Sequence, residues 1–514
     1  MTQLAVVAVY LLAVMGLGLA ANRLLRATSA DYLLASHSIG PVLLLMSLFG
    51  TTMTAFALVG STGQAFQVGA GVYALLASAS GIVHPLCFFL VGVKLWGLGR
   101  RFGYTTQVQF FRDRLESDFV GLLLFPVLVG LVIPYLLIGI DGAGDVINGV
   151  TRGNFEPWFE SSGYGVPQWL ASLAVCGVVL TYVFFGGMRG TAWANTFQTA
   201  VFMVLGVLTF VTVAKGLGGQ ESLLEDMRAA SSQVEPDMIA RTKIPQSVYF
   251  SFLLIPLSVA MFPHVFQHWL TARSARTFRL AIVAHPIFIM IVWLPCVLLG
   301  VWASAPKAGM DGVPPDQVLA AMVGNEASPI LAGLLTAGIL AAVMSSLDSQ
   351  FLCLGTMFTS DIVAHYGGKN RFSDSQIVLL ARGFIVAIVA VTYVLSLISP
   401  ATVFGMSVWC FSGFTGLFPV VMAAIYWRRL TAPGAVAGIL TTVVVWIVMF
   451  WHSGFGATRG YAFPEEPIPL VGGLAIPPLL PVVTITVATA VVMIAVSAVT
   501  RPPSRETLSR FFGE

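Results

Sequence analysis

Long apolar runs recur along almost the whole chain and leave no stretch for a separate soluble domain. A helix needs about 20 apolar residues to cross the hydrocarbon core of a bilayer. Of the 514 residues, only 10% are charged, whereas about 25% is usual in soluble domains. The chain is therefore predicted to be an all-α polytopic membrane protein. We expect thirteen transmembrane helices, at 3–22, 38–66, 71–99, 119–140, 167–187, 190–215, 247–271, 278–304, 328–363, 377–398, 400–427, 431–452 and 475–498.

The basic residues predict the orientation of these spans. With the N-terminus outside, nineteen of the 26 Lys and Arg residues fall on the inner side and seven on the outer side. Such an excess on the cytoplasmic side is typical of membrane proteins. We therefore expect a multi-pass protein of the cell (inner) membrane, with the N-terminus outside and the C-terminus cytoplasmic. Residues 216–246 and 305–327 are two long outer loops, and each is expected to contain a short amphipathic helix.

The remaining composition argues against several classes of protein. The basic residues are scattered at segment ends, so we expect no nucleic-acid partner. The first apolar run has no short-chain cleavage site and is interpreted as a retained span rather than a signal peptide. The five cysteines have neither disulfide-like nor zinc-like spacing; they are Cys87, Cys176, Cys296, Cys353 and Cys410.

Two of the expected spans contain residues that interrupt helices. The run 38–66 is too long for one straight span and carries Gly50 and three threonines near its middle. Glycine and β-branched residues weaken a helix. The run 247–271 carries Pro256 and Pro263, and proline removes a backbone hydrogen bond. Interrupted helices in matching halves of a membrane protein are typical of transporter binding sites, although an ordinary kink in a packed helix is the alternative.

Adjacent hydroxyls and a carboxylate lie within the apolar run 328–363, at Ser345, Ser346 and Asp348. Ionisable residues at membrane depth are rare and usually functional. A small hard cation would satisfy these oxygens, which points to an ion-coupled transporter. The alternative is close helix packing through small residues.

Four stretches together resemble the sodium/solute symporter family of proline, pantothenate, sugar and sialic-acid carriers. They are FGGMRGTAWANTFQ (185–198), Pro134-Tyr135 followed by Asn148, FPHVFQHWLTAR (262–273) and AAVMSSLDSQ (341–350). The resemblance runs from about residue 5 to residue 430. It implies a leucine-transporter-type core of five plus five helices in inverted repeats, with one extra N-terminal helix and two extra C-terminal helices. The corresponding boundaries are 1–35, 38–215, 247–427 and 431–498, followed by a cytoplasmic tail at 499–514.

The resemblance also implies a sodium site between the first broken helix and the eighth core helix. Aligning residues 60–63 with the family's Gly-x-x-Gly stretch assigns carbonyl ligands to Gly50 and Met53. The eighth helix would supply the Ala342 carbonyl and the hydroxyls of Ser345 and Ser346. These three residues lie on one helical face. Five uncharged oxygens suit a monovalent hard ion, whereas calcium would normally require carboxylates.

A second cation site is expected from a departure from the family pattern. Some family members use the acid of a Trp-Thr-Asp motif for a further sodium ion, but Asn195 occupies that place here. Asp348 instead stands where a serine is common. We hypothesise that Asn195, Asp348 and Ser349 hold a second cation, or that Asp348 exchanges a proton. The alternative is an aspartate that is hydrogen-bonded for stability.

The substrate pocket is expected where the two broken helices meet their neighbours. The predicted lining residues are Thr51, Thr52, Thr54, Tyr135, Ser258, Met261 and His264, with Trp409, Phe411 and Phe414 as covering aromatics. No Lys or Arg lies near the middle of these spans, so a carboxylate would have to use helix N-termini and hydroxyls. A small organic acid or amino acid is favoured. The spacing of His264 and His268 could hold a metal, but no acidic residue lies nearby in the sequence.

The sequence therefore predicts a sodium-coupled secondary active symporter that imports a small organic solute by alternating access, with sodium as its ion. The alternatives are a proton-coupled carrier and a solute sensor on a symporter-like fold. A membrane-embedded acyl-transferring enzyme is disfavoured because His84 and His285 have no evident partner, so no enzymatic activity is expected. The expected partners are the lipid bilayer and the solute, and the protein is expected to be a monomer or a weak homo-oligomer.

Overall fold

The architecture described below is that of a computed structural model of the chain. The described residues are 2–21, 32, 39–219, 222–368, 371–399, 401–458, 460–464, 466–469 and 475–513. Four of the basic residues used to predict the orientation lie outside them, namely Arg23, Arg26, Lys369 and Arg459.

The described chain is almost wholly helical. The first half contains α1 (Thr2–Ala21), α3 (Pro41–Thr52), η3 (Phe56–Gly60), α4 (Ser61–Val68), α5 (Gly71–Tyr73), η4 (Ala74–Ser78), α6 (Ala79–Cys87), η5 (Phe88–Gly92), α7 (Val93–Phe102), α8 (Gln107–Leu115), α9 (Asp118–Thr151), η6 (Glu160–Ser162), α10 (Gln168–Gly218), α11 (Leu223–Ser232) and α12 (Pro236–Ile239). The second half contains α13 (Gln246–Phe252), η7 (Ile255–Ala260), α14 (Pro263–Thr271), η8 (Ala275–Thr277), α15 (Phe278–Ala303), η9 (Pro306–Ala308), η10 (Pro315–Gln317), α16 (Val318–Glu326), α17 (Pro329–Met357), η11 (Phe358–Val363), α18 (Ala364–Gly367), α19 (Asp374–Ser396), α20 (Val403–Gly416), α21 (Phe418–Tyr426), α22 (Ala432–His452), β1 (Ile468–Pro469), β2 (Ala475–Ile476), α23 (Pro481–Val499) and α24 (Arg505–Phe512).

Both interrupted spans are broken where the sequence predicts. The pair Pro41–Thr52 and Phe56–Val68 is bent by 60°, and the pair Gln246–Ala260 and Pro263–Thr271 by 50°. Met53 ends α3 in an extended conformation. Phe262, the residue before Pro263, is likewise extended and immediately precedes α14. The predicted breaks at Gly50–Thr54 and Pro256–Pro263 are therefore confirmed as features of the backbone.

Helix α10 is two spans joined at one residue. Its 51 residues correspond to about 76 Å, more than twice the roughly 30 Å of a hydrocarbon core. Gly187 interrupts it, with φ 52° and ψ −155°. Both ends of α10 approach the segment 315–326: Gln168 and Gln317 donate to the same Asp145 carboxylate, and Gly216 lies against Glu326. The chain therefore reverses direction at Gly187.

The described helices account for the predicted number of spans. Ten are long and apolar enough to cross a membrane, and counting each bent pair as one span gives 12. Dividing α10 at Gly187 adds one more, so the thirteen spans of the sequence analysis correspond to elements of the fold. The two segments predicted to contain short helices do contain them, as α11 and as η10 with α16.

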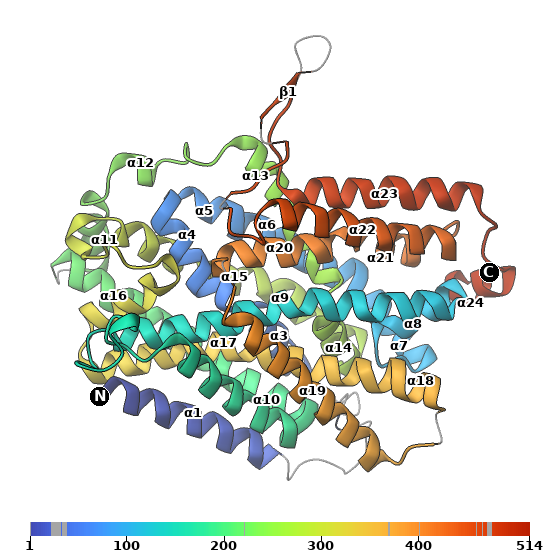
Figure 1. The fold of residues 1–514 in the computed structure, drawn as a ribbon, viewed down its shortest axis with the longest axis horizontal. Helices are drawn as coiled ribbons and strands as arrows, with labels where there is room; N and C mark the ends of the chain where they lie inside the picture. Colours follow the sequence, from blue (N-terminus) through green and yellow to red (C-terminus); the bar gives the residue numbers. More distant parts are fainter. Residues whose placement is uncertain are drawn as a thin grey trace.

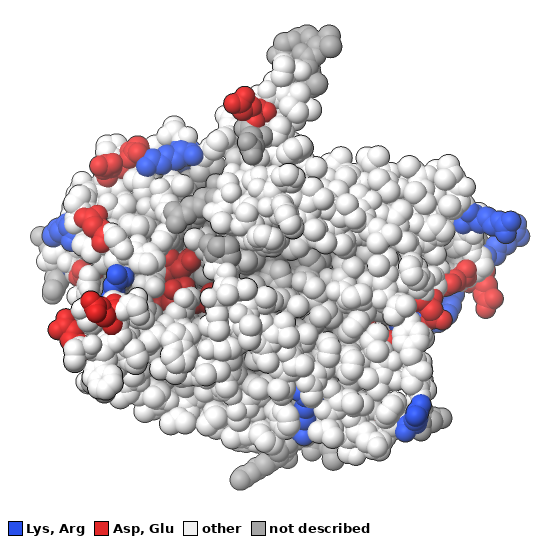
Figure 2. Space-filling model, in the orientation of Figure 1, with Lys and Arg blue, Asp and Glu red and all other residues white. Residues whose placement is uncertain are grey.

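The termini of the chain mark opposite ends of the helical bundle. Figure 1 shows most helices side by side, with α11, α12 and α16 at one end and α18 and α24 toward the other. Charged side chains gather toward these ends in Figure 2, with a broad and mostly uncharged band between them. That uncharged band is the surface expected to face lipid.

Small residues let the N-terminal helix pack closely on the core. α1 contacts α10 and α17. A Cβ atom added to Gly18 would lie only 2.4 Å from Cβ of Tyr182, and one added to Gly333 only 2.7 Å from Cβ of Val6. Such close approach is typical of membrane helix interfaces. α1 therefore packs against both α10 and α17. These two helices carry the buried polar residues Tyr182, Asn195 and Asp348.

Three elements depart from the expected pattern. The last span begins at Pro481 rather than near residue 475, because Ala475–Ile476 pairs with Ile468–Pro469 in a short hairpin. The segments predicted as an inner loop and a polar tail contain the helices α8 and α24. Both are short and polar, so hydropathy alone gave no signal for them.

Candidate functional site

Ser345 joins the first broken helix to α17. Its hydroxyl lies 2.8 Å from the Gly50 carbonyl oxygen and 2.9 Å from the Ala342 carbonyl oxygen. Ser345 is fully buried, and Gly50 is buried as well. The Ser345 hydroxyl is thus within hydrogen-bond distance of two of the other oxygens predicted for sodium, although Gly50 and Ser345 are 295 residues apart.

Gly50 packs closely on α10 because it has no side chain. A Cβ atom there would lie 2.6 Å from Oγ1 of Thr199 on α10. Met53 lies at the break itself, where the chain leaves the helical conformation. Ser346 takes a more local partner, because its hydroxyl donates to the Val343 carbonyl at 3.0 Å.

The donor set fits a small monovalent cation. Hydroxyl and carbonyl oxygens carry no formal charge, and they suit a hard ion better than thiol or imidazole groups would. Among the described residues, no group of three or more His, Cys, Asp and Glu side chains could hold a metal ion. A cation bound here would therefore rely on oxygens such as those of Ser345 and Gly50.

A second polar group lies along α17, around Asp348. Its carboxylate accepts hydrogen bonds from Tyr182 at 3.0 Å and from Ser349 at 3.1 Å. Ser349 in turn accepts a hydrogen bond from Asn195 at 2.9 Å and lies 3.1 Å from Nε2 of His268. The structure thus brings together the three residues predicted for a second cation, Asn195, Asp348 and Ser349, and adds Tyr182 and His268 to them.

This second group is buried and its hydrogen bonds come from neutral side chains. Asp348 and Asn195 are fully buried. The Oδ1 atom of Asn195 and the Nδ1 atom of His268 have no hydrogen-bond partner within the described residues. Burying a carboxylate without a countercharge is costly unless a cation or a proton neutralises it. The unpaired Asn195 oxygen lies in this buried group without a hydrogen-bond donor among the described residues.

Sequence reasoning missed the contribution of Tyr182. It lies on the first half of α10, 166 residues from Asp348 along the chain. A tyrosine within an apolar span usually packs against its neighbours. Here the Tyr182 hydroxyl donates a hydrogen bond to the buried Asp348 carboxylate. No local pattern in the sequence indicates that contact.

Aromatic rings fill the space between the two broken helices. The ring of Tyr135 lies 5.0 Å from Phe262, 5.3 Å from His264 and 5.2 Å from Phe411. Phe411 also reaches Phe56, just beyond the first break, at 5.3 Å. The structure therefore brings Tyr135, His264 and Phe411, three of the residues predicted for the solute, into one aromatic cluster.

The polar atoms near this aromatic group are only partly satisfied. His264 is buried, and neither of its ring nitrogens has a hydrogen-bond partner among the residues described. The same holds for the Thr51 hydroxyl. By contrast, the Thr52 hydroxyl bonds its own helix at the Leu48 carbonyl, 2.8 Å away, and the Thr54 hydroxyl accepts from the Phe56 amide at 3.1 Å. His264 and Thr51 thus have buried polar atoms that no described residue satisfies.

The other residues predicted for the pocket divide into two sets. Ser258 and Met261 are buried in the second break, and Phe414 lies 5.0 Å from Phe262. Trp409 does not join them. Its ring faces α22 and the hairpin segment, 5.3 Å from Phe450 and 5.7 Å from Tyr461. α20 is apolar all round, so its sequence did not show which face Trp409 occupies.

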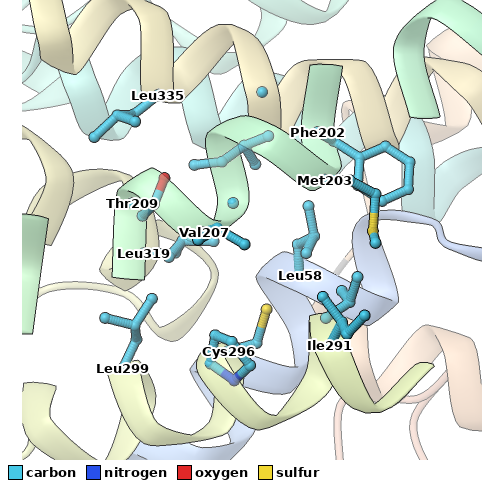
Figure 3. A pocket seen from close by; sticks show the side chains of 15 residues that line it. Leu58, Phe202, Met203, Val207, Thr209, Ile291, Cys296, Leu299, Leu319 and Leu335 are labelled. Carbon is cyan, nitrogen blue, oxygen red and sulfur yellow. The ribbon is translucent and has the colours of Figure 1, made fainter. Parts of the chain in front are cut away.

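Two cavities lie away from all of these residues. A cavity of about 40 Å³ between η3, α10, α15 and α17 is lined by apolar side chains such as Leu58, Phe202 and Leu335 (Figure 3). A larger cavity of about 430 Å³ is lined by Asp141 on α9, by Gln168 and further residues of α10, and by residues of α19. None of the residues predicted for the ion or the solute lines either cavity.

Comparison with known proteins places this geometry in a family. Residues 32–442 match the model of the sodium:solute symporter family. The high-affinity proline transporter PutP of Bacillus subtilis is 26% identical over 433 residues, covering 81% of this chain and 86% of that protein. The sodium/proline symporter of Escherichia coli is 26% identical over 462 residues, covering 84% and 85%.

Solved structures agree in fold. A sodium-coupled sialic acid symporter, in a substrate-bound outward-open state, superposes with a TM-score of 0.74 at 16% identity. The superposition covers 98% of this chain and 99% of that one. A nucleobase-cation-symport-1 family transporter in a closed conformation gives a TM-score of 0.57 at 13% identity. Because the family model spans most of its length and the predicted helices and breaks are present, this chain belongs to the sodium:solute symporter family and has the leucine-transporter-type fold.

Proposed function

We propose that this protein imports a small organic acid or amino acid together with sodium, and that sodium binds between the first break and α17. Members of the family are transporters rather than enzymes. The observation that carries the proposal is the Ser345 hydroxyl, which lies between the Gly50 and Ala342 carbonyls. Met53 and Ser346 supply the remaining oxygens of the proposed site. Bound sodium would take the place of the hydrogen bond from Ser345 to Gly50, since both oxygens would then turn toward the ion.

The solute is proposed to bind among Tyr135, His264 and Phe411, next to both breaks. The two relatives described above are named as proline carriers, so proline is one amino acid to test. The aromatic rings suit the apolar part of a small solute. The free nitrogens of His264 and the Thr51 hydroxyl suit its polar part.

The energetics favour a second cation when the solute is an anion. A tenfold sodium gradient supplies about 1.4 kcal/mol, and a potential of 100 mV adds about 2.3 kcal/mol per charge. An anion carried with one sodium ion moves no net charge and keeps only the first of these terms. We propose that Asn195, Asp348 and Ser349 hold this second cation, because the Asp348 carboxylate is buried among neutral partners.

A proton-coupled carrier is the second candidate function, and the same carboxylate favours it. Asp348 could be neutralised by a proton instead of a cation, and His268 is linked to it through Ser349. Uptake would then depend on a pH gradient rather than on a sodium gradient, so the two functions make opposite predictions.

The orientation follows from the charge distribution. We propose that the N-terminus lies outside and that α8, α18 and α24 lie in the cytoplasm of the cell. The proposed units are the extra N-terminal helix (1–35), the two repeats (38–215 and 247–427), the two C-terminal helices (431–498) and the tail (499–514). Alternating access would then arise from movement of the two broken helices relative to α9 and α17.

The test is uptake into proteoliposomes that contain the purified protein. A panel of radiolabelled neutral amino acids, including proline, and short monocarboxylates is offered with a sodium gradient, a proton gradient or neither. We expect one solute class to accumulate only with sodium outside, and accumulation to stop when choline replaces sodium. Uptake driven by the proton gradient alone would favour the second candidate. Binding of a solute without uptake under any gradient would favour a sensor.

A further inference from the structure

Helix α8 connects several elements at the end of the bundle that carries the C-terminus. At its start, the Thr106 hydroxyl donates to Oδ1 of Asp361 in η11 at 2.8 Å. At its end, the buried Arg114 guanidinium donates to the carbonyls of Ala424 and Trp427, at 3.0 and 3.2 Å. Those carbonyls lie at the C-terminal end of α21, where a positive charge is favourable. α8 is thus fixed to the ends of two long spans.

One side chain of α8 reaches the second break. Gln107 is 2% exposed, and its Nε2 atom donates to the Met261 carbonyl oxygen at 3.1 Å. Met261 lies between η7 and α14 and has non-helical φ and ψ of −114° and 0°. Its carbonyl is one of the groups that a broken helix leaves without its usual partner. Gln107 therefore satisfies the broken backbone from outside the broken span.

The C-terminal helix supports α8 from the other side. The Arg510 guanidinium donates to Asp113 at 3.2 Å, and the Phe511 ring lies 6.2 Å from Phe110 and 5.2 Å from Phe102. Arg114 lies over the ring of Phe512, with 5.0 Å from Cζ to the ring centroid. α8 is therefore held in place by α24, η11 and α21 together, and it can act as a fixed anchor.

We propose that Gln107 is a positioning residue of the transport cycle, which holds the second break in the conformation seen here through the Met261 carbonyl. The inference rests on the proposed alternating access, in which α14 moves relative to α17 and α21. α8 is anchored to η11, which continues α17, and to the end of α21. Movement of α14 away from α17 and α21 must therefore break the hydrogen bond from Gln107 to Met261. The bond therefore stabilises one of the two conformations selectively, as a conformational bias requires.

The experiment measures the conformational equilibrium directly. Spin labels are attached to cysteines at two exposed positions, Arg276 beyond α14 and Ser509 on α24, and their distance distribution is recorded in lipid nanodiscs. Gln107→Met keeps the length of the side chain but removes the donor. A single hydrogen bond corresponds to roughly a three- to tenfold change in an equilibrium. We expect the population with the longer distance to rise by about that factor.

Two further variants separate positioning from folding. Gln109→Met is the matched control: it lies on the same helix, but its side chain bonds Thr105 of the preceding loop. It should leave the distribution unchanged. Gln107→Glu should behave like the wild type at low pH, where a protonated carboxyl can donate to Met261. At high pH the ionised carboxylate has no donor, so this variant should behave like Gln107→Met.

Each outcome bears on the proposal. A distribution that is the same in Gln107→Met and the wild type overturns it, as does a Gln107→Glu distribution that does not change with pH. If Gln107→Met fails to fold, the pH series of Gln107→Glu decides alone. Sodium-driven uptake by the wild type is measured on the same preparations. Its failure would contradict the proposed function, whereas normal uptake with an unmoved equilibrium would contradict only the role of Gln107.

Discussion

Ser345→Ala is the most direct test of the sodium site. The change removes one of the five proposed ligands, and the serine lies 2.8 Å from Gly50 O and 2.9 Å from Ala342 O. Hydrogen bonds and similar polar contacts to a charge contribute about 1.5–3 kcal/mol. Since about 1.4 kcal/mol corresponds to a factor of ten, the affinity for sodium should fall roughly 10- to 100-fold.

The same substitution should affect folding much less. The lost contacts are hydrogen bonds between neutral groups, which contribute about 1 kcal/mol to stability. Ala is also the residue with the highest helix propensity, so α17 is not weakened intrinsically. Ser407→Ala on α20 is the matched control, because Ser407 is also fully buried and donates to a carbonyl of its own helix, that of Val403, at 2.6 Å.

The assay needs no knowledge of the solute. The melting temperature of purified protein is measured against sodium chloride, with choline chloride keeping the ionic strength constant. An ion present at ten times its Kd stabilises the folded state by about 1.4 kcal/mol. The stabilisation should reach its midpoint at much higher sodium in Ser345→Ala than in the wild type or in Ser407→Ala. An unchanged midpoint in Ser345→Ala would refute the proposed coordination, whatever its effect on transport.

The remaining predictions concern the neighbouring groups. Asp348→Asn should change the number of charges moved per solute or the pH dependence of uptake, measured as current and tracer flux on the same vesicles; no change in either would leave Asp348 with a purely structural role. Gly50→Ala should impair sodium-dependent uptake because its Cβ would lie 2.6 Å from Oγ1 of Thr199, and Thr199→Ala should restore part of it; a double variant no better than the single one would contradict this steric reading. Phe411→Ala should raise KM for the solute, whereas Trp409→Ala should lower the melting temperature with little change in KM, since Trp409 packs on α22; equal effects on KM would count against the assigned pocket.

The sequence predicted those features whose cause is local. The two breaks follow from prolines, from glycine and from β-branched residues within otherwise apolar runs. The contact between Ser345 and Gly50 was predicted only through the resemblance to a family, because 295 residues separate them. Tyr182 was missed for the same reason.

The histidines show the limit most clearly. His84 and His285 seemed from the sequence to lack partners, yet Nδ1 of His84 lies 3.1 Å from Nε2 of His285. They are 201 residues apart on different spans, and periodicity within one helix cannot reveal such a contact. Trp409 illustrates a different limit, because a helix that is apolar all round gives no indication of which neighbour each face meets.

The single-residue joint at Gly187 makes α10 intolerant of changes in length. One inserted residue turns everything after it by about 100° around the helix axis. An insertion next to Gly187 would therefore rotate Asn195 away from Ser349. The residues on both sides of Gly187 are helical, so no loop is present at this position to compensate for the rotation. A Cβ atom at Gly187 would also lie 2.8 Å from the Tyr32 carbonyl oxygen. Epitope tags and protease sites for topology mapping belong in the hairpin between α22 and α23, and a relative that carries an extra residue at this joint must orient its polar side chains differently.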